Sequence, residues 1–166
     1  MITHLDGDLL QVQKTLDLDF ICHQVNCQGM MGSGIAKQIR ETYPQVYENY
    51  KKKCDFFVNN KMDLLGQTQI VALFDDFYKE PIHHYVCNLF AQYNYGYDGK
   101  RYTSYDGFWN CLNELKRSIQ PGSKIGFPYL IGCDRGGANW NVIETMIKEV
   151  FEDDYLVYII HYDGGK

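Results

Sequence analysis

Two glycine-rich segments, each between a strand pattern and a helix pattern, limit the fold of this chain more than any other feature. The first is NCQGMMGSGIA at 26–36, which follows the buried strand pattern 17–25. The second is GCDRGGAN at 132–139, which follows the short strand pattern 124–131. Strands that alternate with helices predict βα units, a parallel or mixed sheet, and helices on both faces. In such sheets ligands bind at the carboxyl ends of the strands, in the loops that lead into helices.

The rest of the chain continues this alternation and predicts one α/β domain over residues 1–166, a length typical of a single domain. Further strand patterns cover 68–74, 84–90 and 155–162, and a first strand precedes Asp8. Helix patterns, with apolar residues at the helical period, cover 34–50, 103–119 and 141–151. Pro44 marks either a break in the first of these helices or the start of a second one.

The composition excludes several classes of protein. The 16 Lys and Arg against 21 Asp and Glu leave a net charge of −5, so no general basic field holds a nucleic-acid backbone. Six cysteines without a CxxC pair predict buried free thiols in a reducing compartment. No apolar run approaches the roughly 20 residues of a membrane span, and the N-terminus lacks the pattern of a signal peptide. We therefore expect a cytoplasmic monomer without membrane association.

The first glycine-rich segment has the composition of a phosphate-binding loop. Gly29, Gly32 and Gly34 remove side chains where the backbone must turn sharply or approach a ligand. Exposed N–H groups and the dipole of the following helix then favour an anion, and Ser33 can cap that helix or donate to the ligand. The segment matches neither the GxGxxG nor the Walker pattern. A glycine turn without any ligand is the alternative.

The second glycine-rich segment suggests a partner for the first. Gly132, Gly136 and Gly137 again permit close approach of the backbone. Two such loops in one small α/β domain suit a diphosphate that is held from two sides, which explains how an acidic protein binds an anion. Two turns without a ligand remain the alternative.

Two further features point to a nucleotide. Asp8, just after the first strand, can accept a hydrogen bond from an exocyclic amine such as that of adenine, although a solvated turn residue is the alternative. The tyrosine-rich stretch 92–105 can stack on a base or a sugar, or it can form a turn that packs on its own helix.

The pair His83 and His84 lies on a strand, where adjacent side chains face opposite ways, so the two rings make a poor metal chelate. We therefore expect no metal and no cofactor.

The motifs GDLL at 7–10, HQVNCQGMMGSGIA at 23–36 and IGCDRGGANW at 131–140 together resemble the macro domain family. Their order and spacing extend the resemblance over nearly the whole chain. It is strongest toward the branch of the terminal ADP-ribose glycohydrolases and the ADP-ribose-1″-phosphate phosphatases. The resemblance implies a three-layer α/β/α fold with a central mixed sheet and a cleft for ADP-ribose, free or attached to a protein or nucleic acid.

The resemblance also implies which residues bind. Asp8 would meet the adenine amine with the Leu9 N–H nearby, and Asn26 would face the distal ribose. One side of the diphosphate and that ribose would be wrapped by Gly32, Ser33, Gly34, Ile35 and Ala36. The other wall would be formed by Gly132, Cys133, Asp134, Arg135, Gly136 and Gly137.

The chemistry is less constrained than the binding. Glycohydrolases of this branch carry a lysine after the fourth strand, but here that region reads NLFAQYNYG at 88–96. Hydrolysis at C1″ then needs a positioned water, for which Asp134 is the candidate general base. His23 can act on a phosphate or polarise a water, or it can be a neutral strand histidine. Arg135 can contact a phosphate or lie on the rim.

Three functions remain compatible with these residues. The first is a hydrolase of ADP-ribosyl conjugates or of ADP-ribose-1″-phosphate. The second is a reader that binds ADP-ribose without chemistry, which the missing lysine favours. The third is an α/β module that uses the same loops for NAD or another nucleotide diphosphate.

Overall fold

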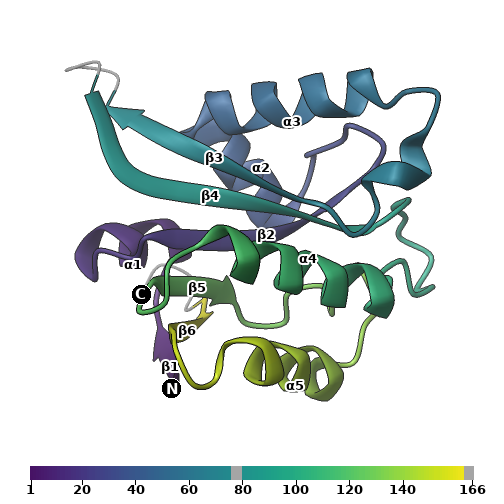
Figure 1. Ribbon diagram of the computed structural model, residues 1–166. Coiled ribbons are helices and arrows are strands. Elements are labelled where there is room, and N and C mark those ends of the chain that lie inside the picture. Colours follow the sequence, from purple (N-terminus) through teal and green to yellow (C-terminus); the bar gives the residue numbers. More distant parts are fainter. Residues whose placement is uncertain (76–79, 163–166) are drawn as a thin grey trace.

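The fold is built around one mixed β-sheet, seen in the computed structural model, which describes residues 1–75 and 80–162 (Figure 1). The strands are β1 (Ile2–Asp6), β2 (Phe20–Asn26), β3 (Thr68–Asp75), β4 (Glu80–Gln92), β5 (Lys124–Pro128) and β6 (Leu156–His161). The helices are α1 (Leu9–Thr15), α2 (Gly34–Thr42), α3 (Pro44–Phe56), the 3-10 helix η1 (Lys61–Leu64), α4 (Tyr105–Ser118) and α5 (Trp140–Phe151).

The order of the strands in the sheet is β1-β6-β5-β2-β4-β3. All neighbouring strands run parallel except β3, which pairs antiparallel with β4. The predicted mixed sheet is therefore confirmed. Because β2 lies between β5 and β4, the carboxyl ends of these three strands meet at one edge of the sheet.

Helices cover both faces of this sheet, which confirms the predicted three-layer α/β/α fold (Figure 1). The helices α4 and α5 pack on one face, where Phe108 and Ile147 join the buried residues of β5 and β6. The helices α1, α2 and α3 pack on the other face, where Ile39 and Tyr50 meet the buried residues of β2 and β4. The central strands β2 and β4 alternate their buried side chains between the two clusters, as Ile21 and Cys22 do on β2.

The predicted elements are present, and several of them differ in extent. The strand β2 covers 20–26 instead of 17–25, and β5 ends at Pro128 instead of 131. Pro44 begins the second helix, α3, because its fixed φ and missing N–H suit the first turn of a helix. The strand β4 runs over 13 residues, well beyond the predicted 84–90, since it pairs with β2 on one side and β3 on the other. Helix α1 was not predicted. Its seven residues follow Asp8, whose carboxylate accepts hydrogen bonds from the N–H groups of Leu10 and Gln11.

The cysteines and helices bear on two further expectations. All six cysteines are free thiols, and five of them are buried, which confirms the prediction of free thiols. Among the helices of the described ranges, none combines the length and the apolar character that crossing a membrane requires.

His23 is part of the core of this fold. Its ring is fully buried on β2, and its Nε2 forms a hydrogen bond with Asn88 Oδ1 on β4. Its Nδ1 is buried without a hydrogen-bond partner in the described structure. Burial lowers the pKa of His23 from its ordinary value of 6.5 to about 4. The imidazole is therefore neutral at pH 7.

We predict that His23 makes the fold sensitive to acid. As the pH falls below 6.5, the unfolded chain takes up the proton first, so the free energy of unfolding decreases until about pH 4. The shift corresponds to roughly 3 kcal/mol. The variant His23→Gln should lose that part of the pH dependence in urea unfolding measured from pH 7 to 4. The exposed His83, replaced by Asn, is the control and should follow the wild type. An unchanged profile in His23→Gln would contradict the assignment.

Candidate functional site

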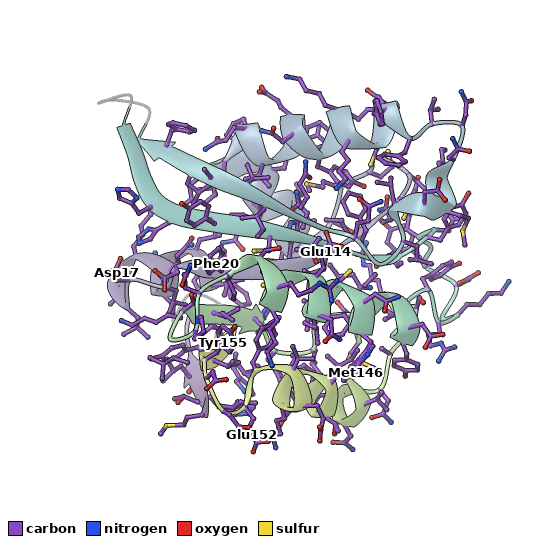
Figure 2. The ribbon with its side chains drawn as sticks, viewed as in Figure 1. Asp17, Phe20, Glu114, Met146, Glu152 and Tyr155 are labelled. Atoms are coloured by element: carbon purple, nitrogen blue, oxygen red, sulfur yellow. The ribbon has the colours of Figure 1, made fainter. Side chains whose placement is uncertain are left out.

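A cavity of about 620 Å³ lies where the two glycine-rich loops lead into α2 and α5. It is bounded by residues at the carboxyl ends of β2, β4, β5 and β6. In Figure 2 the labelled Asp17 and Phe20 mark the opposite end of the sheet, where β2 begins. The volume falls within the roughly 300–1,000 Å³ that is typical of small-molecule sites.

The structure brings most of the predicted binding residues together around this cavity. Those that line it are Leu9, Asn26, Gly32, Ser33, Gly34, Ile35, Ala36, Gly132, Asp134, Arg135 and Gly136. Those that do not line it are Asp8, His23, Gly29, Cys133 and Gly137. The residues of the second group lie at separate places around the cavity. Several of them make contacts that hold the lining residues in position.

The first loop offers hydrogen-bond donors to the cavity. Gly34 has a φ of +59°, in the region that favours glycine, and the place of an added Cβ has no heavy atom within 4 Å. Ser33 stands at the N-cap of α2 without a hydrogen bond from its side chain to the helix. The first N–H groups of a helix have no intrahelical partner. Together with the helix dipole, they favour an anion at this position.

A tyrosine from α3 fastens the start of this loop. Tyr50 Oη donates to the carbonyl oxygen of Asn26 at 2.7 Å and accepts the N–H of Gly29 at 3.1 Å. The Asn26 side chain in turn donates from Nδ2 to the carbonyl of Met30 at 2.8 Å. Burial raises the pKa of Tyr50, so its hydroxyl stays protonated. Gly29 therefore supports the loop from behind, and Asn26 faces the cavity in a fixed orientation.

Asp8 lies just outside the lining because its carboxylate is used for capping. Its Oδ1 accepts hydrogen bonds from the N–H groups of Leu10 and Gln11 at 3.0 and 3.2 Å. Its Oδ2 accepts from Gln38 Nε2 on α2 at 2.7 Å. Gln38 itself lines the cavity. The carboxylate thus joins α1 to α2 at one end of the cavity, next to Leu9.

The second loop packs tightly on the segment before α4. The carbonyl oxygen of Gly136 accepts the N–H groups of Tyr102 and Thr103 at 2.8 and 3.0 Å. Thr103 Oγ1 donates to the carbonyl oxygen of Gly132 at 2.8 Å. A Cβ on Gly136 would lie 2.3 Å from Thr103 Oγ1 and 2.5 Å from the Gly132 oxygen. Only glycine therefore fits at position 136.

Two glutamines at the cavity floor were not predicted from the sequence. Gln24 Nε2 donates to Gln92 Oε1 at 2.8 Å and to Thr103 Oγ1 at 2.7 Å. Both glutamines line the cavity. Gln24 lies two residues before Asn26 on β2, but the register of the strand shifts between Val25 and Asn26. The Asn26 side chain contacts Tyr50 of α3, whereas Gln24 contacts Thr103 before α4. The partners of Gln24 lie far along the chain, so no local pattern in the sequence identifies it.

An aromatic wall next to β6 was also missed. The ring of Tyr129 stacks on that of His161 at 4.0 Å and meets Trp140 edge-on at 5.0 Å. The next residue, Leu130, lines the cavity and has a φ of +67°, which is strained for a residue other than glycine. The predicted tyrosine stretch contributes Tyr95 and Tyr97 to the opposite side. The cavity therefore has aromatic side chains at both ends.

The charged side chains that line the cavity, within the described ranges, are Asp134 and Arg135. No lysine of that part of the chain lines it. Burial raises the pKa of the Cys133 thiol to about 11, so it is not a thiolate at neutral pH. His23 is enclosed in the core on the far side of its strand from Gln24, and the structure does not bring it to the cavity. Asp134 is thus the candidate base that the cavity contains.

No model of a known protein family matches the chain. Over 54 residues it is 43% identical to the DNA ADP-ribosyl glycohydrolase of Mycobacterium tuberculosis, a match that covers 32% of this chain and 14% of that relative. Over 70 residues it is 29% identical to the ADP-ribose 1″-phosphate phosphatase of Meyerozyma guilliermondii, which covers 42% of this chain and 39% of that relative. The chain thus spans less than half the length of either protein.

Solved structures resemble the chain over nearly its whole length. The macrodomain of Thermus aquaticus DarG superposes with a TM-score of 0.72 at 21% identity and covers 98% of both chains. Thermosipho africanus DarTG, solved in complex with ADP-ribose, has a TM-score of 0.71 at 17% identity, over 99% of this chain and 42% of that one. At these identities the likeness concerns the fold.

We predict that the second loop tolerates no side chain at position 136. In Gly136→Ala the new methyl group collides with backbone and with Thr103, so the free energy of unfolding should fall by about 1–3 kcal/mol. The matched control is Gly32→Ala, because no heavy atom lies within 4 Å of an added Cβ there. Urea unfolding of both variants measures the difference. Equal stability of the two would contradict the packing described for this loop.

Proposed function

Because the chain has the macrodomain fold, we propose that it binds ADP-ribose in the cavity between its two glycine-rich loops. We further propose that it hydrolyses ADP-ribosyl conjugates or ADP-ribose-1″-phosphate. One observation carries this proposal: both loops converge on a single cavity of about 620 Å³ at the carboxyl ends of the strands. The activities of the partial relatives from Mycobacterium tuberculosis and Meyerozyma guilliermondii support the choice of reaction.

In the proposed orientation, the adenine lies at the end of the cavity beside Leu9 and Asp8. The diphosphate lies over the N-terminus of α2, where Ser33, Gly34 and Ile35 line the cavity. Hydrogen bonds from backbone N–H groups stabilise the phosphate charges without the need for lysine or arginine. This explains how a chain with a net charge of −5 holds a dianion. The distal ribose then reaches Asn26.

For the reaction, we propose that Asp134 accepts a proton from a water that attacks C1″ of the distal ribose or the phosphorus of its 1″-phosphate. The bond from that atom to the departing group breaks, and the departing group takes up a proton from solvent. Asp134 is an exposed carboxylate on the cavity wall. General-base catalysis by a positioned carboxylate contributes roughly 10²–10⁴-fold to a rate. Arg135, next to it, stabilises negative charge on the leaving group or the diphosphate. A route through a lysine nucleophile finds no candidate among the described lining residues.

A second candidate function is an ADP-ribose reader without catalysis, which the lack of a lysine in the described lining favours. A module for NAD or another nucleotide diphosphate is a further alternative, since the first loop would bind any diphosphate. Competition among ADP-ribose, NAD and AMP separates these cases. We also propose a cytoplasmic monomer, and the six free thiols support the reducing location.

We predict that a side chain at position 34 blocks the ligand. The variant Gly34→Glu places a carboxylate in the empty space beside the α2 N-terminus, where it occupies the anion site and repels a diphosphate. Affinity for ADP-ribose in titration calorimetry should fall by at least about 100-fold, or about 3 kcal/mol. The matched control is Gly122→Glu, which also has positive φ and open space but lies at the opposite end of the sheet. Equal affinity in both variants would refute the proposed position of the diphosphate.

We predict that Asp134→Asn separates binding from turnover. The amide keeps the shape of the side chain but cannot accept the proton, so kcat should fall by roughly 10²–10⁴-fold while KM changes little. The substrates are ADP-ribose-1″-phosphate and an ADP-ribosylated peptide. Asp63→Asn, an exposed carboxylate on η1, is the control. Full turnover in Asp134→Asn would remove this residue from the mechanism.

A further inference from the structure

A contact between two loops lies beside the cavity, next to the end of β4. The guanidinium carbon of Arg135 lies 4.2 Å from the centre of the Tyr97 ring. Tyr97 belongs to the segment 93–104 after β4, and Arg135 belongs to the second glycine-rich loop after β5. Both side chains line the cavity. Since β2 lies between β4 and β5 in the sheet, this contact spans the strand that ends in Asn26.

The segment that carries Tyr97 is fastened at both of its ends. At its start, the carbonyl oxygen of Tyr93 accepts the Cys27 N–H at 3.1 Å. At its end, the N–H groups of Tyr102 and Thr103 donate to Gly136. Tyr97, in the middle, is 72% exposed. Its ring can therefore leave Arg135 while both ends of the segment stay in place.

The contact between Tyr97 and Arg135 is weak enough to open. A cation–π pair at an exposed site shifts an equilibrium by about two- to five-fold. Opening exposes no buried apolar residue, since the Tyr97 side chain is already largely in solvent. A ligand that requires the contact to open can therefore shift the balance at little cost.

We propose that Tyr97 and Arg135 form a clasp over the reactive end of the cavity that selects ligands by what the distal ribose carries. This inference rests on the proposed function. Free ADP-ribose, or a derivative with a group as small as phosphate, binds beneath the closed clasp. An ADP-ribosyl group attached to a macromolecule must leave the cavity between the two loops and hold the clasp open. The clasp therefore favours small derivatives over macromolecular conjugates.

The test compares the affinities of two ligands in the same variants. One ligand is free ADP-ribose, and the other is a peptide that carries one ADP-ribosyl group through a hydrolysis-resistant linkage. In Tyr97→Ala the affinity for the peptide, divided by that for ADP-ribose, should rise by about two- to five-fold. In Tyr97→Phe the aromatic ring is kept, so this ratio should stay at the wild-type value. Thermal unfolding of each variant verifies that it is folded.

Arg101→Ala is the matched control, because Arg101 makes a similar contact with the Tyr105 ring at 4.5 Å without lining the cavity. Its ratio should equal that of the wild type. An unchanged ratio in Tyr97→Ala, or an equal rise in Arg101→Ala, would overturn the clasp. If the wild-type protein binds ADP-ribose while the ratio fails to move, the proposed function stands without it. If the wild type binds neither ligand, the proposed function falls, and the clasp falls with it.

Discussion

The site depends on the parallel pairing of β2 with β5 on one side and β4 on the other. This pairing places the loops after all three strands at one edge of the sheet. The two glycine-rich loops are more than 90 residues apart in the sequence, so no local interaction brings them together. Burial of apolar side chains on both faces holds the strands in this order. A change that separates β5 from β2 would therefore move the two walls of the cavity apart, even if every residue that lines the cavity were kept.

The glycines act on this arrangement in two different ways. Gly136 has no room for a Cβ, because Thr103 and the Gly132 carbonyl occupy that place. Gly34 has room, but its positive φ and its position beside the α2 N-terminus leave an empty space that faces the cavity. The first glycine is needed for packing between loops, and the second leaves the α2 N-terminus uncovered toward the cavity. Glycine density in the sequence indicates both needs but cannot distinguish them.

Much of the fold and part of the site could be predicted from the sequence. The strand and helix patterns predicted the α/β class. The positions of the two glycine-rich loops predicted that Asn26 and Asp134 lie at one site, and both residues line the same cavity. The placement of His23 could not be predicted, because the presence of a histidine on a strand does not show which face of the sheet its side chain occupies. Helix α1 was missed since its seven residues are too few for a clear period. Gln24 and Tyr129 depend on side-chain packing between distant elements, which periodicity does not report.

The two ends of the cavity are built with different stiffness. At one end, Tyr129 is held between His161 and Trp140, and Asp8 joins α1 to Gln38 on α2. Several contacts would have to break together to move that wall, so it suits a part of the ligand that never changes. At the other end, one exposed tyrosine and one arginine make a single contact between two loops. A site that must hold a constant nucleoside and accept variable groups beyond its distal ribose needs this asymmetry, since rigidity at the variable end would exclude the larger ligands.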